Sequence, residues 1–281
     1  MNPMTILKIL LFLALTSPYL KAQHIDIEIL DRSDAQSIPF VNICYSSTET
    51  GELADIDGLA RLDLTNRKPA EEIIFSSLSY TDFKVTVGEL LRDAETVYTI
   101  KLTPNPFVLE EVTVKDSKVK FSERKAGEHR GANGYFDLAR LLVPGSETGV
   151  VMKIKDRYKL KEIRTKMKEV EVDSFLVEFN IYDYSNSEIG HLLQNNRIFK
   201  VFSKEDSERE VVIDVSDQHI WIESDIFVSI EVLRLTSEKT GSILFSGKTK
   251  SDIGYFRKPL GKWQNTYMYP MIYAVTMHMK E

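Results

Sequence analysis

The chain has 281 residues, with 42 acidic against 36 basic side chains, one cysteine and 43% hydrophobic residues. That length suffices for one large domain or two small ones, and the composition excludes a disordered chain and a multi-span membrane protein. The net charge of -6 gives no reason to expect a nucleic acid partner.

The first 22 residues have the pattern of an export leader. Lys8 precedes an apolar run from Ile9 to Leu15, Pro18 ends that run, and no acidic residue occurs up to Ala22. This order is typical of a cleavable secretory signal, with cleavage expected after Ala22. A membrane anchor is the alternative, but a spanning helix needs about 20 apolar residues and this stretch is shorter. We therefore expect an exported mature chain without a transmembrane segment.

Residues 23–114 consist of short alternating segments separated by turn residues. Ile25, Ile27 and Ile29 alternate with more polar neighbours, which is typical of a half-buried strand. The only helix expected here is short, from Val87 to Arg92. Further strands are expected at Phe40–Tyr45, Leu59–Leu64, Glu72–Ser76, Phe83–Val87, Val97–Leu102 and Leu109–Val114. This density of short strands predicts a β-sandwich.

Four motifs in this region stand in a recognisable order: Ile38–Ile43, Gly51–Gly58, Ile73–Tyr80 and Leu109–Val114. Together they resemble the carboxypeptidase-regulatory-like domain, a transthyretin-like sandwich. The closest version is the one in TonB-dependent outer-membrane receptors and other exported proteins of Gram-negative bacteria. Ser79 stands where the family often has glycine, and Ala60 where it has an aromatic residue. The resemblance implies an accessory module without an active site, located in the periplasm or at the outer membrane.

Residues 115–148 are rich in basic side chains and poor in apolar ones, which predicts a linker. A short helix is expected within it, over the apolar cluster that begins at Tyr135 and ends before Pro144.

Residues 149–281 return to strand patterns. Strands are expected at Val150–Ile154, Leu160–Met167, Ser174–Tyr182, Arg197–Phe202, Glu210–Val215, Ile226–Leu235, Ser242–Phe245 and Met271–Met279. In the third of these, Phe175, Val177, Phe179 and Ile181 share one face, while Glu178 and Asn180 lie on the other. Eight strands predict a second sandwich, of jelly-roll type. The expected fold is therefore all-β, with two β-sandwich domains.

The sequence lacks local signatures of catalysis or of metal binding. It has no Gly-x-Ser-x-Gly elbow, its five histidines are scattered singly, and Cys44 lies in an apolar strand as a buried small hydrophobe. Gly247-Lys248-Thr249 lacks the first glycine of a phosphate-binding loop, and Asp55-Ile56-Asp57-Gly58 is better explained as a tight turn than as a calcium loop. We accordingly expect no cofactor, no metal and no enzymatic activity.

Two alternatives remain open. Trp263, Asn265 and Tyr267 lie in an aromatic C-terminal segment of the kind that holds sugars by stacking and hydrogen bonding, although such rings also pack sandwich cores. Paired carboxylates in the second half would instead indicate a hydrolase. The preferred hypothesis is a non-enzymatic binding or scaffolding module of the envelope, whose partner is an envelope protein or a glycan.

Overall fold

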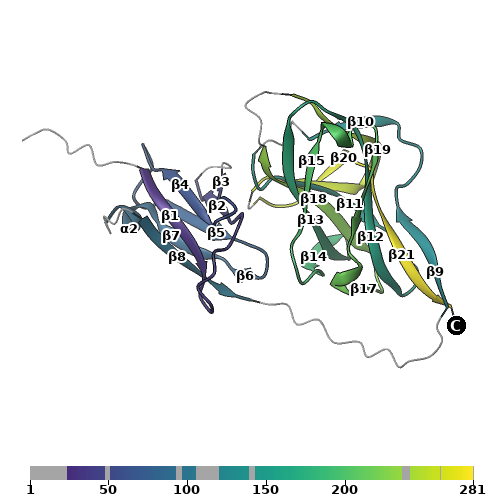
Figure 1. The fold of residues 1–281 in the computed structure, drawn as a ribbon, viewed down its shortest axis with the longest axis horizontal. Coiled ribbons are helices and arrows are strands. Elements are labelled where there is room, and N and C mark those ends of the chain that lie inside the picture. The colour runs from purple at the N-terminus through teal and green to yellow at the C-terminus, as the bar shows by residue number, and fades with distance from the viewer. Residues whose placement is uncertain are drawn as a thin grey trace, which may run out of the picture.

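The computed structural model describes residues 24–47, 51–92, 97–105, 120–138, 143–235, 241–259 and 261–280. The expected leader at residues 1–22 and the expected strand Leu109–Val114 lie outside these ranges. In Figure 1 two β-structured bodies stand side by side, the first in purple and blue and the second in teal, green and yellow.

The first body is a sandwich of two four-stranded sheets. One sheet has the order β4 (Leu59–Asp63), β1 (His24–Asp31), β8 (Val97–Pro104) and β6 (Tyr80–Thr81). The other has the order β3 (Gly51–Leu53), β2 (Asn42–Tyr45), β5 (Glu72–Ser76) and β7 (Phe83–Thr86). Among the described strands of this body, β1 and β8 pair in parallel and the other pairs are antiparallel. The alternation of Ile27 and Ile29 on β1 places both in a core with Ile43 of β2 and Phe75 of β5, as the period of two predicts.

Two local features of this sandwich agree with the predictions made from the sequence. The Asp55 carboxylate accepts hydrogen bonds from the backbone N–H groups of Asp57 (2.9 Å) and Leu59 (2.8 Å), and Gly58 takes φ +74° to close the turn. Asp55 therefore acts in turn formation. The helix α2 (Val87–Arg92) occupies the predicted residues and buries Val87 and Leu90.

The second body is built on a continuous thirteen-stranded sheet that folds into two layers. Its main path runs through β14 (Glu188–Leu192), β13 (Ser174–Ser185), β18 (Ile226–Leu235), β11 (Glu147–Met152), β19 (Ile243–Arg257), β12 (Tyr158–Val170), β21 (Ile272–Lys280) and β9 (Lys120–Gly127). Branching from it are β10 (Gly134–Asp137), β15 (Ile198–Ser203), β16 (Glu210–Asp214), β17 (Trp221–Ile222) and β20 (Gln264–Pro270). Short 3-10 turns cover Lys204–Asp206 and Ser216–Gln218.

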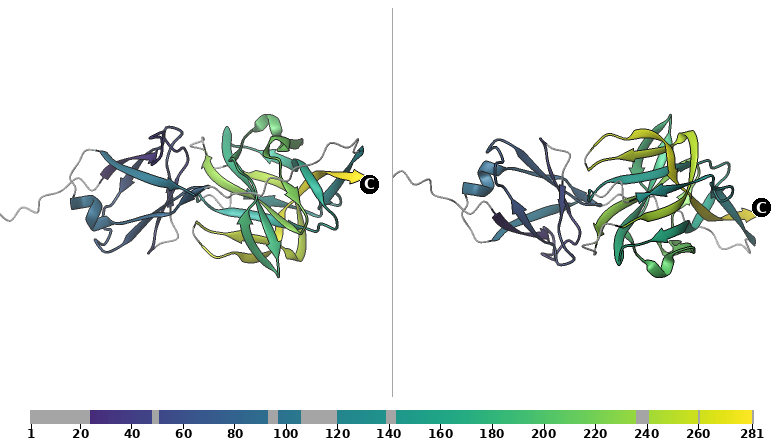
Figure 2. Two further views of the ribbon diagram at one scale, coloured as in Figure 1. Left: turned by 90° about the horizontal axis from the view of Figure 1, so that it is seen from below. Right: turned by 90° about the horizontal axis from the view of Figure 1, so that it is seen from above.

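The core of the second body lies between its two layers. Phe179 on β13 and Val228 on β18 come from one layer, while Ile163 on β12 and Ile272 on β21 come from the other; all four are buried in a single cluster. Figure 2 shows the two layers from below and from above. The protein is therefore all-β and of sandwich architecture, as predicted. No helix within the described ranges has the length and apolarity that crossing a membrane requires.

The prediction of a linker over residues 115–148 is wrong for 120–127 and 134–137, which form strands. Of the short helix expected there, Leu138 is in 3-10 helical conformation, and residues 139–142 lie outside the described ranges. Lys120–Gly127 is an edge strand that pairs antiparallel with β21, and Gly134–Asp137 pairs with β19. The polar composition of β9 misled the prediction, because an edge strand with solvent on one side carries charged residues. Phe136 of β10 lies opposite Phe245 and packs against the core, so it belongs to a strand and not to a helix.

Candidate functional site

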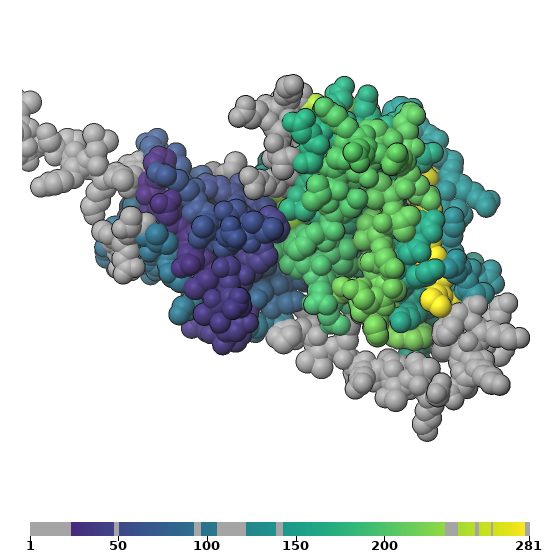
Figure 3. All heavy atoms as spheres, viewed as in Figure 1, coloured from purple at the N-terminus to yellow at the C-terminus, as the bar shows by residue number. Residues whose placement is uncertain are grey.

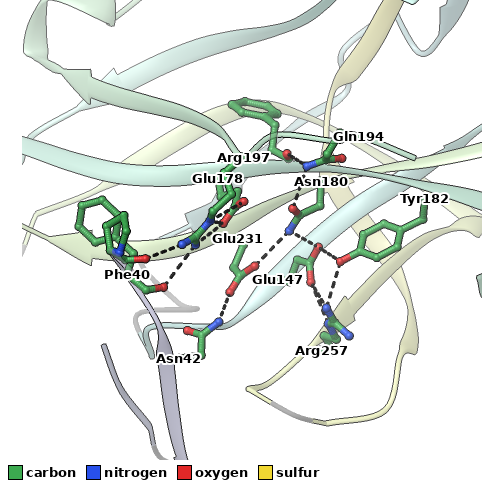
Figure 4. A network of polar contacts seen from close by, with 12 residues as sticks. Phe40, Asn42, Glu147, Glu178, Asn180, Tyr182, Gln194, Arg197, Glu231 and Arg257 are labelled. Carbon is green, nitrogen blue, oxygen red and sulfur yellow. Dashed lines mark hydrogen bonds and ion pairs between the residues drawn. The ribbon is translucent and has the colours of Figure 1, made fainter. Parts of the chain in front are cut away.

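A row of ionisable side chains crosses four adjacent strands of the second sandwich. Glu178 of β13 lies opposite Glu231 of β18, Glu231 lies opposite Glu147 of β11, and Glu147 lies opposite Arg257 of β19. Side chains at directly opposed positions project from the same face of a sheet, so the four form a continuous line. The three carboxylates are between 0% and 8% exposed. The row faces the first sandwich, and Figure 4 shows it from close by.

At one end of the row, Glu147 is saturated with hydrogen-bond donors. One carboxylate oxygen accepts hydrogen bonds from Asn180 Nδ2 (3.0 Å), from the Tyr182 hydroxyl (3.0 Å) and from Ser229. The other accepts from Arg257 Nε at 2.8 Å. Although burial opposes the charge on Arg257, Glu147 raises the pKa of this guanidinium, which therefore stays protonated.

At the other end, Arg197 joins the row to the first sandwich. Its guanidinium donates from Nε to both oxygens of Glu178 at 3.0 Å, and it reaches the backbone carbonyls of Pro39 (2.6 Å) and Phe40 (3.3 Å). The Phe40 ring meets Phe199 edge to face, with 5.4 Å between centroids. One arginine thus pairs with a buried carboxylate and holds the segment before β2.

Between these two ion pairs, the hydrogen-bond partners of the Glu231 carboxyl group among the described residues are side-chain amides. Asn42 of the first sandwich donates to one oxygen (2.7 Å), and Asn180 donates to the other (3.0 Å). Gln194 orients the Asn180 amide by donating to its oxygen at 3.2 Å. Burial, followed by the negative charges of Glu147 and Glu178, raises the pKa of Glu231 to about 8. Burial among these carboxylates therefore favours the neutral, protonated form of Glu231.

A cavity of about 360 Å³ opens between the row and the first sandwich. The second sandwich contributes Glu178, Asn180, Tyr182, Leu192, Arg197, Glu231, Arg257, Pro259 and Gly261, with Gly145 from the turn before β11. The first contributes Asn42, Cys44, the segment from Ser76 to Tyr80, and Asp82. In Figure 3 the blue surface of the first body touches the green surface of the second.

Two polar atoms at this cavity are buried without a hydrogen-bond partner among the described residues, namely Asn42 Oδ1 and Ser77 Oγ. Ser77 as a whole is 9% exposed. Buried polar groups in folded proteins are nearly always hydrogen-bonded, so two unpaired atoms in one cavity indicate a place for a hydrogen-bonding ligand.

The thiol of Cys44 also lines the cavity, but its surroundings suppress reactivity. It is 4% exposed, and burial, followed by the charge of Glu231, raises its pKa to about 12. A thiol with so high a pKa is protonated at neutral pH and is a poor nucleophile. This agrees with the prediction of a buried, structural cysteine.

Next to the row, the same sheet face carries an aromatic cluster. Tyr182 and Phe227 are buried, and the half-buried Trp263 packs edge to face on both, at centroid distances of 6.0 and 4.9 Å. The Arg257 guanidinium lies over the Trp263 ring, 4.4 Å from its centroid. Trp263 therefore supports Arg257 and the cluster beside the cavity.

The three residues proposed from sequence for sugar binding are not brought together in the cavity. Trp263 is half-buried, whereas Asn265 and Tyr267 on β20 are exposed, with Tyr267 at 66%. A shallow apolar groove of about 480 Å³ beside β20 is lined by Thr266 and Met268, which alternate with Asn265 and Tyr267 along the strand.

Sequence reasoning missed the row, although part of its signal was visible. The alternation in their strand places Glu178 and Asn180 together on the face opposite the apolar one. Ser229 with Glu231, and Glu147 with Gly149, show the same alternation on neighbouring strands. The alternation does not reveal the order of the strands in the sheet. That order places these polar faces side by side, beneath the first sandwich.

Comparison with known proteins gives no family. No family model matches the chain, and no curated protein matches its sequence. Among solved structures, it is similar to the cysteine protease and lectin-like domains of Cwp84, a surface layer associated protein of Clostridium difficile. That match has a TM-score of 0.40 and 10% identity, and it covers 78% of this chain and 48% of the other, about half of its length.

Two further structures are more distant. Infectious bursal disease virus, Gx strain, matches with a TM-score of 0.23 and 7% identity, over 85% of this chain and 60% of the other. A carbohydrate-binding module of the β-sandwich superfamily matches with a TM-score of 0.18 and 9% identity, over 88% of this chain and 100% of the other. These similarities carry no argument about activity or ligand.

Proposed function

We propose that this protein is a non-enzymatic binding module of the bacterial envelope, and that the cavity between its two sandwiches holds the ligand. The observation that carries this proposal is the pair of unpartnered buried atoms, Asn42 Oδ1 and Ser77 Oγ, at a cavity otherwise lined by hydrogen-bonding groups. Ligand sites occur preferentially at domain interfaces and combine a few convergent polar groups with a preformed hollow.

The contacts of the ionisable groups favour binding over chemistry. Glu178 is held by Arg197 and Glu147 by Arg257, so neither carboxylate is free to act as a nucleophile or base. The Cys44 thiol is protonated at neutral pH for the reason given above. Arg197 also donates to the first sandwich, and these groups together shape a polar cavity.

A hydrolase is the second candidate, because one observation favours it. Glu231 keeps its proton near neutral pH and lines the cavity together with Glu178. A general acid needs a raised pKa so that it is protonated at neutral pH, and most glycoside hydrolases use a pair of carboxyl groups. The bidentate contact of Arg197 with Glu178 counts against this candidate.

The location in the envelope is part of the proposal. It is supported by the leader pattern of residues 1–22 and by the resemblance of residues 23–114 to the carboxypeptidase-regulatory-like domain. The partner is then an envelope protein or a glycan. Asn265 and Tyr267, exposed on β20 next to Trp263, form an alternative sugar-binding surface on the second sandwich.

A ligand screen tests the proposed function. The mature chain is screened by thermal shift and isothermal titration calorimetry against neutral sugars, amino acids, phosphate and divalent cations, and each binder is followed by mass spectrometry for turnover. Asp82→Trp, an exposed position at the cavity, is the blocking variant, and Asp173→Trp, an exposed position elsewhere, is the control.

Binding without turnover that is lost only in Asp82→Trp is the expected result. No binder in the whole panel, or equal binding by Asp82→Trp, overturns the proposed site. Turnover that disappears in Glu231→Gln overturns the non-enzymatic function and establishes the hydrolase.

A further inference from the structure

We propose that the cavity recognises a neutral polyhydroxylated group the size of one or two sugar rings, and that this ligand bridges the two sandwiches. This inference rests on the proposed function, because it names the class of ligand for the same cavity. Three properties of the lining support it: its charge balance, its hydrogen-bonding groups and its size.

The cavity wall carries little uncompensated charge. Glu178 and Arg197 neutralise one another in a contact of 2.6 Å. Arg257 is neutralised from behind the wall by Glu147, also at 2.6 Å. Glu231 is surrounded by amide donors and holds a proton at neutral pH. Because only the exposed Asp82 adds a net charge, the interior offers neither the positive field that a phosphate needs nor the free carboxylates that a divalent cation needs.

The unpaired atoms require a ligand that donates hydrogen bonds. Asn42 Oδ1 is an acceptor and requires a donor, whereas the hydroxyl of Ser77 is able to do either. Ser76 and Ser79 also line this wall, whereas the Tyr80 hydroxyl donates to the Asp31 carboxylate at 2.8 Å. A ligand carboxylate only accepts and cannot satisfy Asn42 Oδ1, whereas a sugar hydroxyl donates to this oxygen and also accepts from a serine hydroxyl.

The size and the aromatic residues of the cavity agree with this class. A volume of about 360 Å³ lies at the small end of the range of ligand pockets. Of the two tyrosines that line it, Tyr182 is 6% exposed, whereas Tyr80 of the first sandwich is half-buried and has the more accessible ring. An aromatic side chain with a polar tip offers an apolar face to the C–H groups of a sugar ring and a hydrogen bond to its hydroxyls.

The ligand would contact both domains and so couple binding to their docking. Asn42 and Ser77 belong to the first sandwich, and Glu178 and Arg257 to the second. A ligand that binds only the docked arrangement stabilises it by mass action. Amides in the segment before β2 and in the segment from Ser76 to Asp82 should therefore exchange more slowly when the cavity is occupied.

The test uses the mature chain and measures affinity together with amide exchange. The probes are neutral hexoses, N-acetylhexosamines and their disaccharides, compared with inorganic phosphate, amino acids and calcium. The informative variant is Ser77→Ala, and Ser122→Ala is the matched control, because Ser122 Oγ is also unpartnered but lies on β9, outside the cavity. Removing an unsatisfied buried hydroxyl leaves stability unchanged or raises it, so a loss of affinity is not a folding defect.

The expected result is that a neutral sugar binds, and that Ser77→Ala weakens its affinity about tenfold while Ser122→Ala does not. The interface amides should also exchange more slowly with the sugar bound. If only a charged probe binds, the ligand class is wrong while the proposed function stands. If no probe binds, the proposed function fails as well. If the sugar binds but Tyr267→Ala abolishes it and Ser77→Ala does not, the ligand lies on β20 and this inference is overturned.

Discussion

Replacing Arg197 with methionine should uncouple the first sandwich from the second. Arg197 is the only described partner that donates to the buried Glu178, which is 2% exposed, and it also donates to the carbonyls of Pro39 and Phe40. Removing one partner of a buried ion pair costs about 3–5 kcal/mol, because the other charge is left uncompensated. Methionine retains the apolar stem of the side chain, so most of this cost is electrostatic.

The assay is denaturant unfolding followed by two probes. Trp221 and Trp263 both lie in the second sandwich, so their fluorescence reports that body, while amide exchange over Pro39–Asn42 reports docking of the first. The matched control is Arg157→Met. Arg157 pairs with the exposed Glu223 at 2.9 Å, and exposed pairs contribute at most about 1 kcal/mol.

Arg197→Met should destabilise the protein several times more than the control and accelerate exchange at Pro39–Asn42. Adding Glu178→Gln should restore part of the loss, because the uncompensated charge disappears. The explanation fails if Arg197→Met behaves like Arg157→Met, if exchange before β2 is unchanged, or if Glu178→Gln restores nothing.

Three other predictions follow from the same contacts. The folded state raises the pKa of Glu231 to about 8 from a usual value of 4.5, so the stability that its proton contributes is complete below about pH 4.5 and is lost as the pH rises to 8. In that window the free energy of unfolding of the wild type should fall, relative to that of Glu231→Gln, by up to roughly 1.4 kcal/mol per pH unit. Parallel plots of unfolding free energy against pH for the two proteins would contradict this. Gly149→Ala should lower the melting temperature by several degrees or prevent folding, because the new Cβ would lie 2.6 Å from the Ser229 Cα and 2.7 Å from the Phe227 ring. An unchanged melting curve would show that the neighbouring strands move apart to accommodate the methyl group. Tyr269→Phe should leave the free energy of unfolding unchanged or raise it by about 1 kcal/mol, because the buried Tyr269 hydroxyl has no partner among the described residues; a clear loss in denaturant unfolding would reveal a missed hydrogen bond.

The apolar groove beside β20 is a different kind of surface from the cavity. Tyr135 is 56% exposed and Met268 36%, and both line it. Isolated apolar side chains on a surface are ordinary, and nothing else at this groove indicates an occupant. The polar cavity therefore remains the better supported site.

The strands were predictable because their signal is local. Alternation with a period of two needs no knowledge of neighbours, and it located Glu72–Ser76 and Ile226–Leu235 at the bounds that the structure shows. The turn at Asp55 and the helix from Val87 to Arg92 are likewise encoded by adjacent residues. The edge strand β9 escaped prediction because its pattern resembles that of a solvated linker.

The sequence by itself determined that the chain forms sandwiches, and it showed that Glu178 lies opposite the apolar face of its strand. Only the tertiary structure decided that this polar face is buried. Burial depends on which strands are neighbours and on where the first sandwich docks, and contacts such as Asn42 with Glu231 join residues that are far apart in the chain. These polar residues became the candidate site because the first sandwich docks over them.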